Sequence, residues 1–208
     1  KASNIAMAAA PVAALAGPAI NGAGASFPAP IYQRWFADYA RATGNRVNYQ
    51  SVGSGSGVRQ FIAGTINFGA SDEAISAADA AKVNRGVVQI PMVGGTIAIA
   101  YNKPGCNLKL TQKQAVDIFS GRINNWKQVG CAAGPMLVVH RSDGSGTTYA
   151  FTNSLKAFGG WTAGVSKSVK WPTGIGAKGN EGVAARIRQS NGAIGYVNTG
   201  FVRANKLQ

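Results

Sequence analysis

The chain has 208 residues, enough for one domain or two small lobes with a real hydrophobic core. Hydrophobic residues make up 46% of it, which excludes a disordered chain, and its longest apolar stretch, 5–15, is too short to span a bilayer. Twenty-one Lys and Arg against seven Asp and Glu give a net charge of +14, which favours anionic partners. The basic residues are scattered rather than in runs, which is more typical of a solvated surface than of a nucleic-acid track.

Short β-rich segments alternate with helical segments along the chain. The first half predicts strand 20–24, helix 28–42, strand 46–51, helix 57–63, strand 66–70 and helix 76–82. A β-rich stretch, 87–101, follows and is interrupted by Pro91 and Gly94-Gly95. The second half predicts helix 111–119, strand 136–140, helix 147–158, helix 182–189 and strand 193–197. Such alternation is typical of an α/β fold with a largely parallel or mixed sheet, where ligands bind between a strand end and the next helix.

The N-terminal segment, 1–19, is expected to be a leader. Residues 5–12 are small and apolar, and Ala14-Leu15-Ala16 has the small-x-small form of a signal-peptidase site. The segment is therefore either a signal remnant cleaved after Ala16 or an Ala- and Pro-rich leader that stays on the protein.

The two cysteines, Cys106 and Cys131, lie in turn-like sequence on either side of one helix-like unit. Their segments can meet, so a disulfide is expected, and a disulfide suits an exported protein in an oxidising compartment. Two free thiols are the alternative. A zinc site is not expected because the chain has one histidine and no obvious third or fourth ligand, and we expect no other cofactor.

Three Gly- and Ser-rich loops, 22–27, 53–57 and 143–147, each stand between a predicted strand and a predicted helix. Glycine lets backbone N–H groups approach a ligand closely, and a helix N-terminus adds free N–H donors and about half a positive charge. Serine and threonine add hydroxyl donors. Three such loops in one chain predict a site for a small oxyanion.

Two charged residues beside these loops sharpen the prediction. Arg141 precedes the third loop by two residues and can grip an oxyanion with two N–H groups, although a surface arginine at a strand end is the commoner case. Asp72 ends a strand, where a helix cap is the commoner role. Beside an oxyanion, however, an ionised carboxylate accepts the O–H of phosphate and meets only lone pairs on sulfate. Asp72 therefore predicts selection of phosphate over sulfate.

Sequence signatures of enzymes are weak in this chain. The Gly-x-Ser-x-Gly motif and the Gly-Lys-Ser/Thr of nucleotide-binding loops are absent, and His140 is the one imidazole that a catalytic triad could use. Residues 174–179 match G-x-G-x-x-G, but no acidic residue follows Glu181 to bind a ribose, so we interpret 174–179 as a loop. A binding protein is predicted rather than an enzyme.

The order of these motifs resembles one family closely. The matching segments are GAGASFPAP at 22–30, VNYQ at 47–50, GSGSGV at 53–58, FGASD at 68–72, RSDGSGT at 141–147, KWP at 170–172, 176–182, and GAIGYV at 192–197. They resemble the periplasmic phosphate-binding proteins of Pst-type ABC transporters from about residue 21 to 196. The resemblance implies a type II periplasmic-binding-protein fold, two lobes with mixed sheets that close over one phosphate, a periplasmic or extracellular location, and a membrane permease as partner.

The resemblance also implies a role for each residue of the ligand site. Ser26, where the family usually has threonine, and Ser54 would donate hydroxyls, and Phe27 would donate its backbone N–H. Asp72 would accept the phosphate O–H, and Arg141, steadied by Asp143, would supply positive charge. The remaining donors would come from a helix N-terminus, at Ser145, Gly146 and Thr147.

The sequence departs from the family after Gly-Tyr-Val, where the family's chain returns to the first lobe. We expect a first lobe at 20–90, left incomplete, and a second at 91–208, whether the chain is a fragment or a natural short form. An unpaired sheet edge invites association with another chain, so the alternative function is that of a structural or surface-assembly subunit that self-associates. Nonspecific nucleic-acid binding through the +14 charge is a third, less favoured interpretation.

Overall fold

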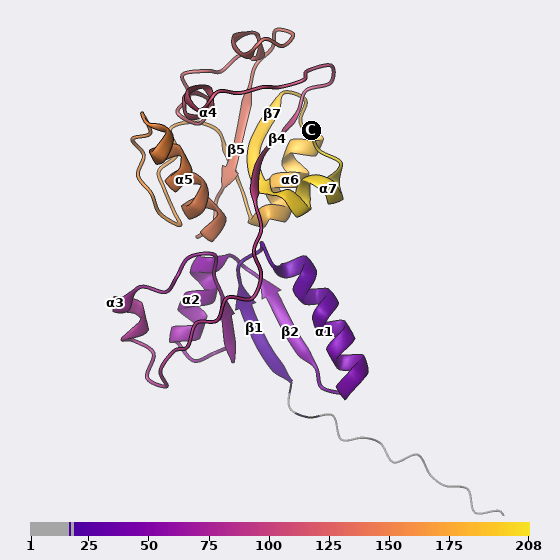
Figure 1. The fold of residues 1–208 in the computed structure, drawn as a ribbon, viewed down its shortest axis with the longest axis vertical. Helices are drawn as coiled ribbons and strands as arrows, with labels where there is room; N and C mark the ends of the chain where they lie inside the picture. Colours follow the sequence, from indigo (N-terminus) through magenta and orange to yellow (C-terminus); the bar gives the residue numbers. More distant parts are fainter. Residues whose placement is uncertain (1–16, 18) are drawn as a thin grey trace, which may run out of the picture.

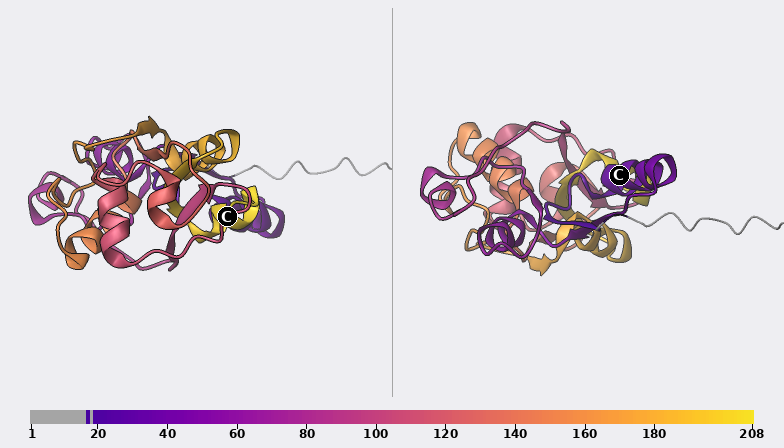
Figure 2. Two further views of the ribbon diagram at one scale, coloured as in Figure 1. Left: turned by 90° about the horizontal axis from the view of Figure 1, so that it is seen from above. Right: turned by 90° about the horizontal axis from the view of Figure 1, so that it is seen from below.

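The computed structural model describes residues 17 and 19–208, which form two α/β units stacked along the long axis of the molecule (Figure 1). Views from the two ends overlay the units on one another, so they do not lie side by side (Figure 2). The connecting segment, 87–96, runs from the first unit up to the second (Figure 1). The predicted leader, 1–19, falls outside the described residues except for Gly17 and Ala19. No helix in the described part of the chain is long and apolar enough to cross a membrane.

The first unit is built on a parallel sheet with the strand order β2-β1-β3. Its elements are β1 (Ile20–Gly24), α1 (Ala29–Thr43), β2 (Val47–Ser51), α2 (Ser54–Ile62), β3 (Phe68–Ala70) and α3 (Ala77–Ala80). Gly24 pairs with Ser51 on one side and with Ala70 on the other, so the three strands end at the same level. The loops that follow them, which carry the first-unit residues of the predicted site, therefore share one edge.

The second unit is built on a mixed sheet with the strand order β4-β7-β5-β6, in which β4 alone among the four is antiparallel to its neighbour. Its elements are β4 (Ile97–Asn102), α4 (Gln112–Phe119), the 3-10 helix η1 (Trp126–Val129), β5 (Leu137–Arg141), α5 (Gly146–Phe158), β6 (Ile175–Ala177), α6 (Gly179–Gln189), β7 (Ala193–Asn198) and α7 (Thr199–Asn205). Arg141 pairs with Ala177, which aligns the ends of β5 and β6. In Figure 1 the end of β5 faces the first unit.

Burial differs between the two units. In the second, alternate residues of β7 enter two buried clusters on opposite faces of the sheet, with Tyr196 in one and Val197 in the other. In the first, no residue of the strands β2 and β3 is fully buried. Large apolar side chains at Val88, Ile90 and Met92 stand exposed on the connecting segment. The second unit therefore holds the main hydrophobic core of the described chain.

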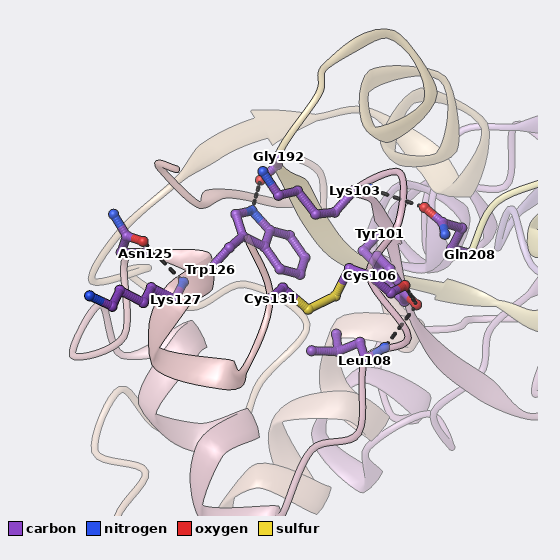
Figure 3. Close-up of a disulfide and its surroundings, with 10 residues drawn as sticks. All are labelled: Tyr101, Lys103, Cys106, Leu108, Asn125, Trp126, Lys127, Cys131, Gly192 and Gln208. Carbon is purple, nitrogen blue, oxygen red and sulfur yellow. Dashed lines mark hydrogen bonds between the residues drawn. A yellow bond between two sulfur atoms is a disulfide. The ribbon is translucent and has the colours of Figure 1, made fainter. Parts of the chain in front are cut away.

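The disulfide predicted between Cys106 and Cys131 is confirmed, with their Cα atoms 5.4 Å apart (Figure 3). It lies beside the buried side chain of Trp126, whose indole N–H donates to the carbonyl of Gly192 at 3.0 Å. The Tyr101 hydroxyl donates to the Cys106 carbonyl at 3.0 Å. The bridge therefore closes the segment 106–131, which contains α4 and η1, against the core of the second unit.

Most predicted elements are confirmed, including the caps at Ser76 and Thr111. Two helices begin three residues earlier than predicted: α2 at Ser54 instead of residue 57, and α6 at Gly179 instead of residue 182. Their first turns are rich in glycine and carry no apolar periodicity to mark them. The interpretation of 174–179 as a loop was wrong, because it contains β6 and the start of α6. Of the stretch 87–101 only its end, in β4, is a strand. The elements η1 and α7 have no counterpart among the predicted elements.

Candidate functional site

The loops at the carboxyl ends of the strands meet where the two units face each other, and side chains from the units hydrogen-bond directly. The Gly146 N–H donates to Ser54 Oγ at 3.1 Å, and the Thr147 hydroxyl donates to Asp72 Oδ2 at 3.1 Å. Ser26 Oγ is tied to the second unit through α6. The structure thus brings the predicted residues of both units into one polar cluster.

Arg141, at the end of β5, is held rigidly within this cluster. Its Nε and Nη2 donate to the two carboxylate oxygens of Asp143 at 2.7 and 2.5 Å, and its side chain is 2% exposed. Nη1 is buried too, and it has no hydrogen-bond partner among the described residues. The guanidinium therefore has N–H groups left over for an acceptor that the described side chains do not supply.

Asp143 anchors this arginine and remains ionised. Burial raises its pKa, but the hydrogen bonds and charge of Arg141 outweigh burial and lower it, helped by the Gly179 N–H, which donates to Oδ1 at 3.2 Å. The ion pair is thereby tied to the first residue of α6. Because both charges are buried, the pair fixes the direction of the guanidinium better than an exposed pair could.

Tyr196, on β7, supports the backbone beneath Arg141. Its hydroxyl accepts the Arg141 backbone N–H at 3.2 Å and bonds with the Thr148 hydroxyl at 2.6 Å. Burial raises the pKa of Tyr196 to about 12, so the phenol stays neutral at physiological pH. This side chain is a support of the site that sequence reasoning did not identify.

Asp72, after β3, supplies a carboxylate to the cluster. Burial raises its pKa, while the hydrogen bond from Thr147 and the charge of Arg141 act in the opposite direction. Oδ2 accepts the Thr147 hydroxyl, and Oδ1 has no hydrogen bond within the described residues. One oxygen of the carboxylate is thus oriented by the protein and the other remains for a ligand.

Two helix N-termini, those of α2 and α5, meet at the cluster. Gly53 is the N-cap of α2 with φ +86°, and a Cβ there would collide with Asp143 Oδ2. Ser54, the first residue of α2, accepts the Gly146 N–H, which leaves its hydroxyl proton free to donate. A Cβ on Gly146 would lie 2.6 Å from Asp72 Cβ, so a side chain at this position would push the units apart.

Ser145, the N-cap of α5, offers its hydroxyl rather than its backbone. Its Oγ accepts the Thr148 N–H at 3.0 Å, and its own N–H donates to the Lys167 carbonyl at 2.9 Å. The backbone N–H groups of Thr147 and Phe27, by contrast, have no partner within the described residues. The donors that point to no protein acceptor are therefore a mixture of hydroxyls and backbone amides, as expected at helix N-termini.

One further residue of the cluster, Asn180 in the first turn of α6, was missed by sequence reasoning. It is 1% exposed, and its side-chain amide donates to Ser26 Oγ at 2.9 Å. The signal was present, because residues 175–179 follow the same order of strand, glycine turn and helix as the three loops that were singled out. A helix expected to begin at residue 182 hides this order, because it leaves residue 180 outside the helix.

The chemistry of the cluster is that of an anion receptor. It offers N–H and O–H donors, one cationic guanidinium and one free carboxylate oxygen. In the described ranges no three His, Cys, Asp or Glu side chains come close enough to hold a metal ion. The imidazole of His140 stacks on Trp171 and its Nδ1 bonds with the Arg141 carbonyl, so it does not activate a serine of the cluster.

Comparison with known proteins places this geometry in a family. The model of the PBP superfamily domain matches residues 9–208. The chain is 47% identical over 204 residues to the phosphate-binding protein PstS of Pasteurella multocida, covering 90% of this chain and 58% of that protein. It is also 47% identical to PstS of Haemophilus influenzae, covering 90% and 60%. The chain therefore spans somewhat more than half the length of these relatives.

Solved structures share the fold. A phosphate ABC transporter substrate-binding protein of Clostridium perfringens aligns with a TM-score of 0.77 at 22% identity, over 90% of this chain and 73% of that one. The periplasmic phosphate-binding protein PfluDING, solved with phosphate, aligns with a TM-score of 0.74 at 30% identity, over 88% and 57%. The type II periplasmic-binding-protein fold expected from the sequence is confirmed.

Proposed function

Because the chain belongs to the PBP superfamily, we propose that it binds inorganic phosphate between its two units, as the substrate-binding component of a phosphate ABC importer. It then acts by binding and delivery, not as an enzyme, in the periplasm or outside the cell, and a membrane permease is its partner. The first unit, residues 20–90, and the second, 91–208, are the two lobes of this receptor. PstS relatives carry phosphate binding in their names, which supports the proposal.

The observation that carries the proposal is the buried Nη1 of Arg141. A buried guanidinium N–H without an acceptor is costly, and the carboxylate of Asp143 already uses Nε and Nη2. A bound oxyanion would accept from Nη1 and remove that cost. It would also lie beside the unpartnered N–H groups of Phe27 and Thr147.

The remaining donors surround the same anion in this proposal. Hydroxyls would come from Ser26, Ser54 and Ser145, and the N-termini of α2 and α5 would add their partial positive charge. Gly146 contributes by lacking a side chain, since its N–H already bonds with Ser54. Thr147 contributes its backbone N–H, and its hydroxyl orients Asp72.

Asp72 would make the site selective for phosphate. Phosphate at neutral pH retains an O–H that Oδ1 can accept, whereas sulfate has only lone pairs to offer. Leaving a buried acceptor without a donor costs about 1–3 kcal/mol, so one carboxylate disfavours sulfate by about 5- to 150-fold.

Calorimetric titration of the purified chain with phosphate, with sulfate as competitor, tests the function. Saturable phosphate binding that excess sulfate does not displace is the expected result. R141A should abolish it, while R122A, which removes an exposed arginine paired with Asp117, should leave it unchanged. A folded chain that does not bind phosphate refutes the proposal.

Self-association is the second candidate function, and the exposed connecting segment favours it. Val88 is 84% exposed, Ile90 67% and Met92 59%, in a segment without secondary structure whose backbone groups have few partners within the described residues. The same exposed apolar segment on a second copy would cover these side chains. Analytical ultracentrifugation of the wild type and of V88K/I90K tests this. A monomeric wild type refutes self-association, and a wild-type dimer that V88K/I90K converts to a monomer supports it.

A further inference from the structure

Asn180 connects three parts of the molecule through one buried amide. Its Nδ2 donates to Ser26 Oγ of the first unit at 2.9 Å and to Thr147 Oγ1 of α5 at 3.3 Å. Its backbone N–H also donates to Ser26 Oγ, at 3.0 Å. The residue therefore contacts two of the hydroxyls assigned to the phosphate site, although it lies outside the three site loops in the sequence.

The orientation of this amide is determined by a fourth contact. Asn180 Oδ1 lies 2.8 Å from the backbone nitrogen of Asn198, at the end of β7. A backbone N–H can only donate, so the amide oxygen must face Asn198. The NH₂ group must then face the two hydroxyls.

The N–H groups of Asn180 decide which way the hydroxyl protons point. A hydroxyl has one proton and two lone pairs, and both lone pairs of Ser26 Oγ are taken by N–H groups of Asn180. Its own proton is therefore available only to an outside acceptor. Thr147 Oγ1 likewise accepts from Asn180 and donates to Asp72 Oδ2 at 3.1 Å.

We propose that Asn180 is a positioning residue that makes the hydroxyls of Ser26 and Thr147 donors, the first toward the bound anion and the second toward Asp72. The inference rests on the proposed phosphate site. Without this amide each hydroxyl would be free to turn its lone pairs toward the ligand, which phosphate oxygens would repel. With it, the site presents donors to the anion and a correctly oriented carboxylate to its O–H.

The sharpest test is N180D, which keeps the shape and replaces the NH₂ by an acceptor. The hydroxyls of Ser26 and Thr147 should then turn toward the new carboxylate and be lost to the ligand and to Asp72. We expect phosphate affinity to fall by about a hundredfold or more near neutral pH. As the pH is lowered into the range where the introduced carboxyl is protonated, its O–H again serves Ser26, so affinity relative to the wild type at the same pH should recover in part.

N180A provides the comparison that separates polarity from structure. It removes both side-chain donors without adding an acceptor, so affinity should fall by about tenfold with no recovery at low pH. A purely structural role would instead weaken binding alike in both variants and at every pH. A double-mutant cycle with S26A adds a second readout, since N180A should cost much less once the Ser26 hydroxyl is absent.

Asn102, on β4, offers a matched control because its side chain contacts the opposite end of α6. Its Nδ2 donates to the carbonyls of Ile187 and Arg188 at 3.1 and 2.9 Å, outside the site. N102A should lower the melting temperature and leave phosphate affinity unchanged. The far- and near-ultraviolet circular dichroism of each variant checks that it is folded.

The outcomes separate this inference from the function on which it rests. A folded wild type that does not bind phosphate overturns both. If the wild type binds phosphate and both N180D and N180A bind it as tightly as the wild type, the role of Asn180 alone is overturned. The same holds if the phosphate affinities of the two variants depend on pH in the same way. Weak binding by N180D with recovery at low pH, together with non-additivity between N180A and S26A, establishes it.

Discussion

Replacing Asp72 by asparagine tests how the site would choose its anion. In D72N the Thr147 hydroxyl still needs an acceptor, so the amide oxygen should take the place of Oδ2, where that hydroxyl donates at 3.1 Å. The NH₂ group then stands where Oδ1 faced the ligand. Phosphate loses the acceptor for its O–H, and sulfate meets a donor in place of lone pairs.

The size of the effect follows from one buried contact. Relief of an unsatisfied buried acceptor is worth about 1–3 kcal/mol, which predicts that the ratio of phosphate to sulfate affinity falls by about 5- to 150-fold. The variant should fold well, because burial raises the pKa of Asp72 and therefore disfavours its ionised form in the native state. D72N removes that ion, and its melting temperature at neutral pH should be no lower than that of the wild type.

Separate calorimetric titrations with phosphate and with sulfate give the affinity ratio for each protein. D79N is the matched control, since Asp79 pairs with Lys82 at 2.7 Å on the exposed helix α3 and its loss should not change the ratio. An unchanged ratio in folded D72N would refute the selection mechanism. Loss of phosphate binding without any gain for sulfate would show that Asp72 serves the site by another route.

Four more predictions follow, three from the contacts around the site and one from the disulfide. As the pH falls through the raised pKa of Asp72, the carboxyl gains a proton and can donate to sulfate, so selectivity should decline at acid pH in the wild type but not in D72N. Because that proton is held more tightly in the folded state, the carboxyl's contribution to the free energy of unfolding is present below its unfolded pKa and lost as the pH rises through the folded value, which urea unfolding across that range measures. G146A places a Cβ 2.6 Å from Asp72 Cβ and 2.8 Å from Ser54 Oγ, so phosphate affinity in titrations should drop by about tenfold or more with the fold intact. C106A/C131A opens a loop of sequence separation 25 and should lower the free energy of unfolding in urea by about 3.5 kcal/mol, with little effect on affinity.

Much of the fold could be predicted because its signals are local. Strand β2, with apolar Val47 and Tyr49 at alternate positions, and helix α1 show the apolar spacing of their own periods, and Thr111 marks the start of α4 with a capping box. The helix starts at Ser54 and Gly179 could not be found in this way. A first turn that faces a ligand site carries small and polar residues, so it lacks the apolar repeat from which a helix is predicted.

The candidate site, too, could be predicted only where its signals are local. Its loops, with Arg141 and Asp72, could be identified because each stands at a strand end that local pattern reveals. Which donor faces which acceptor could not be predicted, because the partners are distant in sequence: Ser26 and Asn180 are 154 residues apart. Such pairs exist only once the two sheets are assembled and their strand ends aligned.

Taken as a set of donors and acceptors, the cluster is asymmetric in a way that argues for one class of anion. The available donors are the hydroxyls of Ser26, Ser54 and Ser145, the backbone N–H groups of Phe27 and Thr147, and Nη1 of Arg141. Against them, within the described part of the chain, stands one oriented acceptor, Oδ1 of Asp72. An anion that fits must present several unprotonated oxygens and one O–H, which describes phosphate near neutral pH and not sulfate. Because the donors are held by partners within the protein, with Asn180 on Ser26 and Asp143 on Arg141, the site cannot readily reverse a hydroxyl to suit another ligand, and its selectivity should persist wherever that internal network is intact.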